Sequence, residues 1–165
     1  MSYAGCRVVN NFNSFKDLYP FTSLYFDLSP YKLHYLDEGE GEVLLFLHGN
    51  PTWSFYYRSL IQNFQGRYRC VVPDHIGCGF SDKPQDYNYT LTTHIDNLEK
   101  LVDFLGLKNI TLVLHDWGGA IGMGLAVRKP ELVKRLVLFN TAAFLLGDIP
   151  LRIGLCRMPL LGTIL

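Results

Sequence analysis

A single aspartate stands where its carboxylate could act as a nucleophile. Residues 112–119 read LVLHDWGG, so an apolar run is followed at once by Asp116 and then by small residues. That order predicts a sharp turn from a strand into a helix, in which Gly118 and Gly119 allow close packing and Asp116 is exposed at the tip. The helix N-terminus favours an ionised carboxylate there. Asp116 could instead be a plain helix N-cap, which is the commoner role of an aspartate before a helix.

Two other apolar runs end in loops that carry polar residues and glycines. Val43–Leu47 leads into HGNPTW at residues 48–53, and Cys70–Val72 leads into PDHIGCGFSD at residues 73–82. In an open α/β sheet, ligands bind outside the carboxyl ends of the strands. Three strand ends with matched loops therefore favour a catalytic role for Asp116 over a cap.

The elements that position these loops alternate between strand and helix. Short apolar runs without alternation are typical of parallel strands that helices cover on both faces. The predicted strands are Val43–Leu47, Cys70–Val72, Ile110–Leu114 and Leu136–Phe139. The predicted helices are Trp53–Phe64, Leu91–Leu105 with Thr90 as its N-cap, and Gly118–Arg128, which ends before Lys129-Pro130. This alternation predicts a doubly wound α/β sheet.

The segment before the alternating part has a different pattern. From Phe21 to Asp37, two short segments rich in Tyr, Phe and Leu flank Ser29-Pro30, and the turn residues Gly39–Gly41 follow. This predicts an antiparallel pair of strands, so the sheet is expected to be mostly parallel with an N-terminal antiparallel pair.

Composition limits the classes of function. The 165 residues carry 15 Lys and Arg and 15 Asp and Glu, which gives no electrostatic footprint for nucleic acid. No apolar run approaches the ~20 residues that span a bilayer, and no secretory leader is visible, so a cytoplasmic protein is expected. The four cysteines lie far apart, which favours reduced thiols. There is no dinucleotide fingerprint, P-loop or metal-ligand cluster, so no cofactor or metal is implied, and the expected partner is a small hydrophobic substrate.

The motifs HGNPTW, DxxGxGxSD and HDWGG, in this order and spacing, resemble the haloalkane dehalogenase branch of the α/β-hydrolases. Within that branch, the run HDWGGAIG, residues 140–144 (NTAAF) and the entry LHYLDEG look most like the β-lactone decarboxylases of olefin biosynthesis. The resemblance covers roughly residues 20 to 165. It implies an N-terminal lead-in at 1–20, the N-terminal half of the hydrolase core at 21–145 and the start of a cap region at 146–165, without most of the cap and the C-terminal strands.

The resemblance also implies roles for individual residues. Asp116 would be the nucleophile, and the backbone N–H groups of Asn50 and Trp117 would form the oxyanion hole. The side chains of Asn50 and Trp117 would hold the departing anion, since both are hydrogen-bond donors. His48 and Gly49, like Gly118 and Gly119, would shape the loops around the nucleophile.

Four readings of the activity follow from this resemblance. Haloalkane dehalogenation, through an ester on Asp116, stands first, and decarboxylation of a cis-β-lactone to an alkene stands close beside it. Epoxide hydrolysis is third, because epoxide hydrolases usually have a bulky aromatic residue where this chain has Asn50. The fourth reading, from another class, is a truncated and non-catalytic fragment.

The chain departs from the family pattern after the nucleophile. The α/β-hydrolase order is nucleophile, acid and then histidine, yet all five histidines precede Asp116. Asn140 stands where one dehalogenase subgroup has its acid, and Asp148 matches no motif. The acid and the base are therefore expected beyond Leu165. A sheet that ends at Leu136–Phe139 would expose an apolar edge, so poor solubility of the 165-residue chain is also expected.

Overall fold

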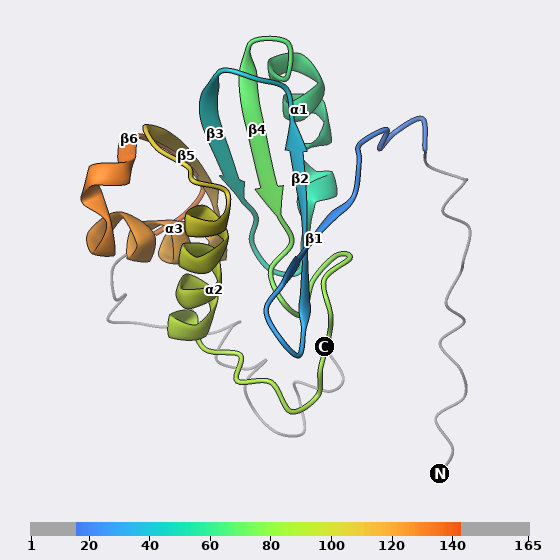
Figure 1. The fold of residues 1–165 in the computed structure, drawn as a ribbon, viewed down its shortest axis with the longest axis vertical. Helices are drawn as coiled ribbons and strands as arrows, with labels where there is room; N and C mark the ends of the chain where they lie inside the picture. Colours follow the sequence, from blue (N-terminus) through green and yellow to red (C-terminus); the bar gives the residue numbers. More distant parts are fainter. Residues whose placement is uncertain (1–15, 143–165) are drawn as a thin grey trace.

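Six strands and three α-helices alternate along residues 16–142, the part of the chain that this computed structural model describes (Figure 1). In chain order the elements are β1 (Leu24–Asp27), β2 (Lys32–Glu38), β3 (Glu42–Leu47), the 3₁₀ helix η2 (Ser54–Tyr57), α1 (Arg58–Phe64), β4 (Tyr68–Pro73), α2 (Leu91–Phe104), β5 (Ile110–His115), α3 (Trp117–Arg128), the 3₁₀ helix η3 (Pro130–Leu132) and β6 (Val133–Phe139).

The strands form one mixed sheet in the order β1-β2-β4-β3-β5-β6. Strands β1, β2 and β4 are antiparallel neighbours, whereas β4, β3, β5 and β6 run parallel to one another. Parallel neighbours need crossover connections, and the helices α1, α2 and α3 supply them. The predicted doubly wound sheet with an N-terminal antiparallel pair is confirmed.

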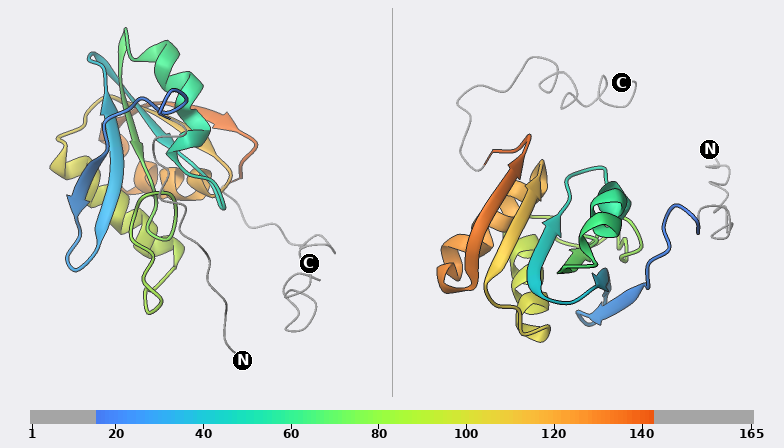
Figure 2. Two further views of the ribbon diagram at one scale, coloured as in Figure 1. Left: turned by 90° about the vertical axis from the view of Figure 1, so that its right-hand side faces the viewer. Right: turned by 90° about the horizontal axis from the view of Figure 1, so that it is seen from above.

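The sheet has a separate hydrophobic core on each face. Leu45 of β3 packs in one cluster with Leu98 of α2 and Ile121 of α3. The next residue, Phe46, packs in a second cluster with Ile61 of α1. Successive strand residues point to opposite faces, so both must be apolar where helices cover both sides. The right-hand view of Figure 2 shows the sheet between α1 and the pair α2–α3.

The predicted strands and helices all exist, with small changes at their ends. Thr90 caps α2 as expected, because its side chain accepts a hydrogen bond from the N–H of Thr93. Strand β6 begins at Val133, three residues before its predicted start at Leu136. Its first half carries Lys134 and Arg135, which form ion pairs with Glu42. These charged residues interrupt the apolar run by which the strand was predicted.

The segment predicted as one helix over Trp53–Phe64 begins with a tighter turn. Residues Ser54–Tyr57 form the 3₁₀ helix η2, and the α-helix starts only at Arg58. Tertiary hydrogen bonds hold this turn, since the N–H of Ser54 donates to Asp74 at 2.7 Å and the hydroxyl of Tyr57 donates to the carbonyl of Leu47 at 2.9 Å. The helical spacing of apolar residues in the sequence does not indicate these tertiary hydrogen bonds.

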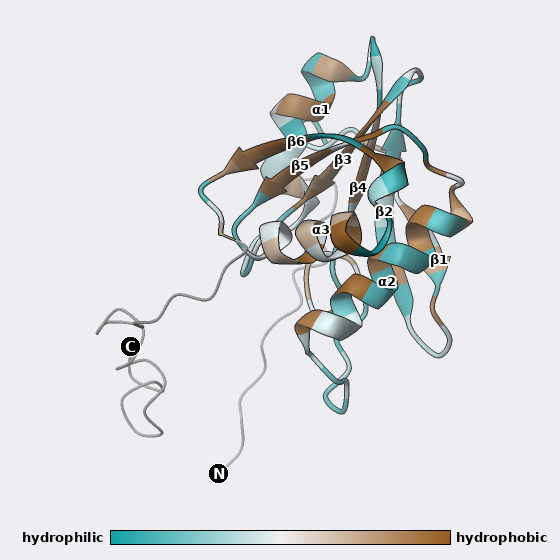
Figure 3. Cartoon of the chain, turned by 90° about the vertical axis from the view of Figure 1, so that its left-hand side faces the viewer, coloured by the Kyte–Doolittle hydropathy of each residue, from teal (hydrophilic) through white to brown (hydrophobic). Residues whose placement is uncertain are grey.

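Strand β6 lies at the edge of the sheet, with β5 as its neighbour. Figure 3 shows β3, β5 and β6 as the apolar strands of the sheet. The last four residues of β6 are nevertheless substantially exposed; these are Leu136, Val137, Leu138 and Phe139. The expected apolar edge is therefore present within the described part of the chain.

Two of the expected segments fall largely outside the described residues. The lead-in at 1–20 is described only from residue 16, and the cap region at 146–165 not at all. Among residues 16–142, no helix is both long and apolar enough to cross a membrane.

Candidate active site

Asp116 occupies the single residue between strand β5 and helix α3, where its backbone adopts a left-handed conformation with φ 52° and ψ −127°. A residue other than glycine costs on the order of 1–3 kcal/mol there and persists only where its surroundings hold it. The N–H of Gly119 donates to the Asp116 carbonyl at 2.9 Å, and the hydroxyl of Thr141 donates to the same oxygen at 2.6 Å. The predicted strand-to-helix turn is present, and Asp116 at its tip is exposed.

Asn50 follows β3 and approaches Asp116 from the neighbouring strand end. Its backbone N–H donates to Oδ1 of Asp116 at 3.0 Å. One of the two predicted oxyanion-hole donors thus lies against the predicted nucleophile. Trp117 begins α3 directly after Asp116, and its side chain is 55% exposed. The structure brings these three residues together, while their catalytic roles stay predictions.

Glycines allow this close approach of the two loops. A Cβ on Gly49 would lie 2.2 Å from Oδ1 of Asp116, well inside van der Waals contact. A Cβ on Gly118 would lie 2.1 Å from the carbonyl oxygen of Leu47, so a side chain there would push α3 away from β3. A Cβ on Gly119 would likewise clash with the hydroxyl oxygen of Thr141. The small residues are required because strand β3 and the start of α3 nearly touch.

His48 ties the loop after β3 to the loop after β4. Its Nδ1 lies 2.8 Å from the carbonyl oxygen of Gly49, and its Nε2 accepts a hydrogen bond from the backbone N–H of His75 at 3.0 Å. A carbonyl only accepts, so Nδ1 carries the proton and Nε2 is bare. Burial lowers the pKa of His48 and outweighs the Gly49 hydrogen bond and nearby carboxylates, which raise it. The neutral ring has no nitrogen left for a substrate.

A buried carboxylate, Asp74, fixes the start of the loop that follows β4. It accepts hydrogen bonds from the backbone N–H groups of Ser54 and Phe80, and its Oδ2 lies 2.9 Å from Nδ1 of His34. Burial raises the pKa of Asp74, but the His34 contact and the two backbone donors outweigh it, so the pKa ends below its ordinary value. Asp74 thereby joins β2, β4, η2 and the loop beside Asn50.

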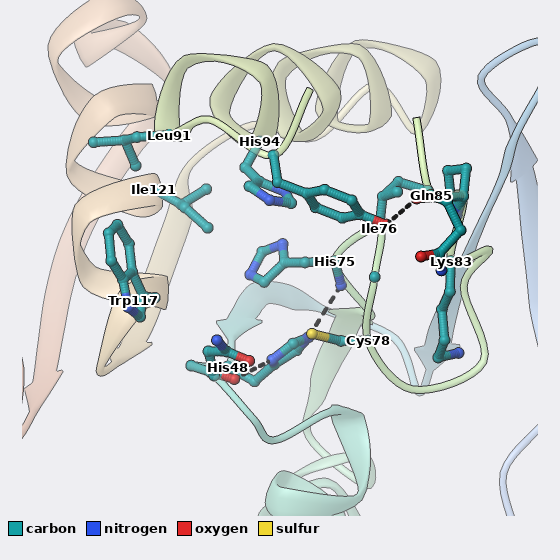
Figure 4. A pocket seen from close by; sticks show the side chains of 15 residues that line it. His48, His75, Ile76, Cys78, Lys83, Gln85, Leu91, His94, Trp117 and Ile121 are labelled. Carbon is teal, nitrogen blue, oxygen red and sulfur yellow. Dashed lines mark hydrogen bonds between the residues drawn. The ribbon is translucent and has the colours of Figure 1, made fainter. Parts of the chain in front are cut away.

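A cavity of about 580 Å³ opens next to residues that flank Asp116, although Asp116 itself is not among its lining residues. Gly49, Asn50 and Trp117, which flank Asp116, line one end of it. Further along, its walls are formed by the loop after β4, by the start of α2 and by Ile121 of α3 (Figure 4). Its lining is more apolar than polar, and its size is in the range that holds small organic ligands.

Several other sequence-based expectations can be placed. Asn140 ends β6 in a left-handed conformation with φ 39°, while Asp148 lies outside the described residues. Of the cysteines, Cys70 and Cys78 lie in the described part and are free thiols. Within residues 16–142, no three His, Cys, Asp or Glu side chains gather as a metal site would require.

Sequence reasoning missed three contributors to this region. His75 and His94 line the cavity, a position that the sequence motifs did not indicate for either residue. Thr141 binds the backbone of the nucleophile, although only its place in the run NTAAF had been noted. The PDH tripeptide at residues 73–75 was the available signal for His75, because it follows a strand end directly.

Two curated enzymes are similar to this chain in sequence. Cis-3-alkyl-4-alkyloxetan-2-one decarboxylase of Shewanella oneidensis is 55% identical over 154 residues, which cover 90% of this chain and 48% of that protein. Haloalkane dehalogenase 2 of Mycobacterium bovis is 45% identical over 124 residues, which cover 75% of this chain and 43% of that protein. The chain thus spans about half the length of these relatives.

Solved structures show the same fold. The haloalkane dehalogenase DpaA of Paraglaciecola agarilytica NO2 superposes with a TM-score of 0.79 and 34% sequence identity, covering 87% of this chain and 52% of the other. Residues 42–154 also match the family model described as the alpha/beta hydrolase fold. The chain belongs to the α/β-hydrolase family and is related to the haloalkane dehalogenases and the β-lactone decarboxylases.

Proposed function

We propose that this chain carries the nucleophile of an enzyme that converts a cis-3-alkyl-4-alkyloxetan-2-one into an alkene and carbon dioxide. The observation that carries the proposal is the strained Asp116, whose carboxylate accepts a hydrogen bond at 3.0 Å from the N–H of Asn50, a residue that lines the neighbouring cavity. The 55% identity to a decarboxylase of this substrate class supports this reading over dehalogenation, which the sequence motifs alone had placed first.

The proposed reaction balances without water or a redox partner. An oxygen of Asp116 attacks the saturated, alkyl-bearing ring carbon that is bonded to the ring oxygen. The bond between this carbon and the ring oxygen breaks, which gives an alkyl ester and a free carboxylate. The bond between the adjacent carbon and the carboxylate then breaks. Its electron pair forms the alkene as the ester oxygen leaves, so carbon dioxide departs and Asp116 is regenerated as a carboxylate.

Asn50 and Trp117 have a defined part in this proposed reaction. Negative charge passes from Asp116 to the carboxylate released by ring opening. Hydrogen-bond donors fixed in place at that position lower the barrier, because they need no reorganisation during the reaction. The Asn50 and Trp117 side chains line the cavity next to the nucleophile and offer amide and indole N–H groups.

Haloalkane dehalogenation is the second candidate, favoured by the 45% identity to a haloalkane dehalogenase. Asp116 would displace halide from a saturated carbon, and the halide would leave with the bonding electron pair to the same donors. The resulting ester then needs water activated by a base, a step that the decarboxylase reaction does not require. Epoxide hydrolysis stays the third candidate, because epoxide hydrolases usually have a bulky aromatic residue where this chain has Asn50.

The test compares products and intact mass. The 165-residue chain is incubated with a cis-β-lactone or with a 1-bromoalkane of matched length, and alkene, bromide and protein mass are measured. We expect alkene from the lactone, lost in Asp116→Asn and kept in Asp103→Asn, whose carboxylate lies on the exposed side of α2. Bromide and an alkyl adduct without alkene would favour the dehalogenase reading. Neither product nor adduct would overturn both and support the non-catalytic fragment.

A further inference from the structure

Three histidines form a cluster along one side of the cavity. His48 follows β3, His75 follows β4 and His94 lies in α2 (Figure 4). The ring centroids of His48 and His75 are 4.4 Å apart, and those of His75 and His94 are 5.7 Å apart. Three imidazoles at this spacing come from three separate elements, so the fold itself assembles them.

The three rings differ in what their nitrogens contact. Both nitrogens of His48 are engaged, by the Gly49 carbonyl and by the His75 backbone N–H. Nε2 of His75 and Nδ1 of His94 are buried and have no hydrogen-bond partner among residues 16–142. His75 is only 7% exposed, so water does not readily replace a missing protein partner. A buried polar atom without a partner is unfavourable for folding and requires an explanation.

The position of His75 suggests what its partner is. In Figure 4 its ring extends from the loop after β4 toward Trp117 and Ile121 on the opposite wall. Ile76, Leu91 and Ile121 supply apolar lining, and Asn50 and Trp117, which flank Asp116, line the same cavity. His75 is therefore a polar group directed into a cavity whose lining is more apolar than polar. Pockets of this kind use a few placed polar groups to orient a ligand.

His75 remains a neutral imidazole at neutral pH. Burial, and then the neighbouring rings of His48 and His94, hold the pKa of His75 well below its ordinary value of 6.5. A neutral ring has one N–H donor and one bare nitrogen. Within residues 16–142, no hydrogen bond to the ring fixes which nitrogen carries the proton. It can present an N–H to a ligand oxygen without introducing a charge.

We propose that His75 is a specificity-determining residue whose ring N–H binds an oxygen of the substrate, so that the cavity prefers a lactone over a haloalkane of equal length. This inference rests on the proposed function for the identity of the substrate. A lactone offers a carbonyl and a ring oxygen as acceptors, whereas a haloalkane leaves the buried nitrogen unpaired. Sites built to hydrogen-bond a substrate discriminate strongly against analogues that lack the matching group.

The test measures binding separately from reaction. The Asp116→Asn chain, which cannot form the ester, is titrated with a cis-β-lactone or with a 1-bromoalkane of matched length. Fluorescence of Trp117, which lines the cavity, gives the dissociation constants. Spectra of ¹⁵N-labelled histidine side chains, assigned with His75→Phe, report which ring nitrogen is contacted.

Three further substitutions are made in the same background. His75→Phe keeps a ring of similar size and removes its nitrogens. His75→Gln restores an N–H donor. His115→Phe is the matched control, because Nδ1 of His115 is equally buried and unpartnered but its ring stacks on Tyr56 outside the cavity. Far-UV circular dichroism checks that each variant keeps its fold.

We expect the lactone to shift the His75 ring signal and His75→Phe to weaken lactone binding by about tenfold or more, with bromoalkane binding changed by less than about twofold. His75→Gln should recover part of the lactone affinity, and His115→Phe should leave it unchanged. Equal losses for both ligands, no loss for either, or a lactone that does not bind would overturn the inference. Binding through His75 without any alkene from the wild-type chain would instead refute only the proposed function.

Discussion

The backbone N–H of Asn50 points at Oδ1 of Asp116 across 3.0 Å, although 66 residues separate the two along the chain. Asn50 lies in the loop that leaves β3, and Asp116 directly follows β5, the neighbouring parallel strand. The contact exists because parallel strands deliver their carboxyl ends to the same edge of a sheet. It also depends on Gly49, which lets the two loops come this close.

Substitution of Gly49 by alanine should therefore damage the site more than the fold. The new Cβ would lie 2.2 Å from the Asp116 carboxylate, so the carboxylate or the loop must move. A displacement near 1 Å at a reacting group can cost on the order of 100-fold in rate. We expect ester formation on Asp116 to slow by at least about tenfold, measured by intact mass against time.

Gly66→Ala is the control for that substitution. Gly66 lies in the turn between α1 and β4, where an added Cβ meets nothing within 4 Å. It should leave the rate of ester formation unchanged. Equal rates in Gly49→Ala and Gly66→Ala would show that the close approach of Gly49 to Asp116 does not position the nucleophile.

Removal of the Asp74 carboxylate should destabilise the whole domain. Asp74→Ala leaves the N–H groups of Ser54 and Phe80, together with the His34 ring, without their acceptor in a buried position. Breaking a buried pair by removing one partner costs about 3–5 kcal/mol. Urea denaturation should show a loss of this size in the free energy of unfolding.

The exposed pair of Asp103 and Lys129 provides the comparison. The two side chains meet at 2.6 Å, but the Asp103 side chain is 56% exposed. Surface pairs contribute at most about 1 kcal/mol. If Asp103→Ala cost as much as Asp74→Ala, burial would not explain the importance of Asp74.

The sheet and the nucleophile were predictable from the sequence for clear physical reasons. The central residues of β3 and β5 are buried and point to both faces of the sheet, so the runs Val43–Leu47 and Leu112–Leu114 are apolar throughout and visible in the sequence. Asp116 was recognisable because a strand-to-helix turn demands the small residues Gly118 and Gly119 within three positions. Such local constraints leave a signature in neighbouring letters of the sequence.

The remaining parts of the site depend on contacts between distant segments. His34 and Asp74 come from positions 40 residues apart, and neither has a neighbour that reveals the pair. His75 and His94 share a wall of the cavity only because the fold brings the start of α2 beside the loop that follows β4. The charged residues Lys134 and Arg135 made the first half of β6 look unlike a buried strand. Their partner, Glu42, lies at the start of β3, far away in the sequence, so the pairing could not be predicted from neighbouring residues.

The buried histidines should make stability depend on pH in a defined window. Burial is the main reason that the pKa values of His48, His75 and His94 are lowered from 6.5. Between the lowered value and 6.5 the unfolded chain binds more protons, so stability is full above pH 6.5 and falls as pH decreases below it. Each unit of pKa difference contributes about 1.4 kcal/mol.

Urea denaturation at about pH 7.5 and about pH 5 measures this effect. The free energy of unfolding should be smaller at the lower pH, and the difference should shrink in His75→Phe, which removes one of the three groups. The lowered pKa of Asp74 affects stability only below its ordinary value of 3.8, outside this window. An unchanged difference in His75→Phe would mean that His75 does not resist protonation in the folded state.

The exposed edge of β6 should govern association of the 165-residue chain. Leu138 is 53% exposed on the edge strand, and Leu136, Val137 and Phe139 beside it are also open. An apolar strand edge offers unpaired backbone groups to another chain, and a charged side chain on the edge opposes such pairing. We expect Leu138→Lys to reduce self-association, measured by sedimentation velocity over a range of concentrations. Val127→Lys places the same charge on helix α3 rather than on a strand, at a side chain that is 82% exposed, so it should change association much less. Equal effects of the two lysines would indicate that net charge, rather than the β6 edge, controls association.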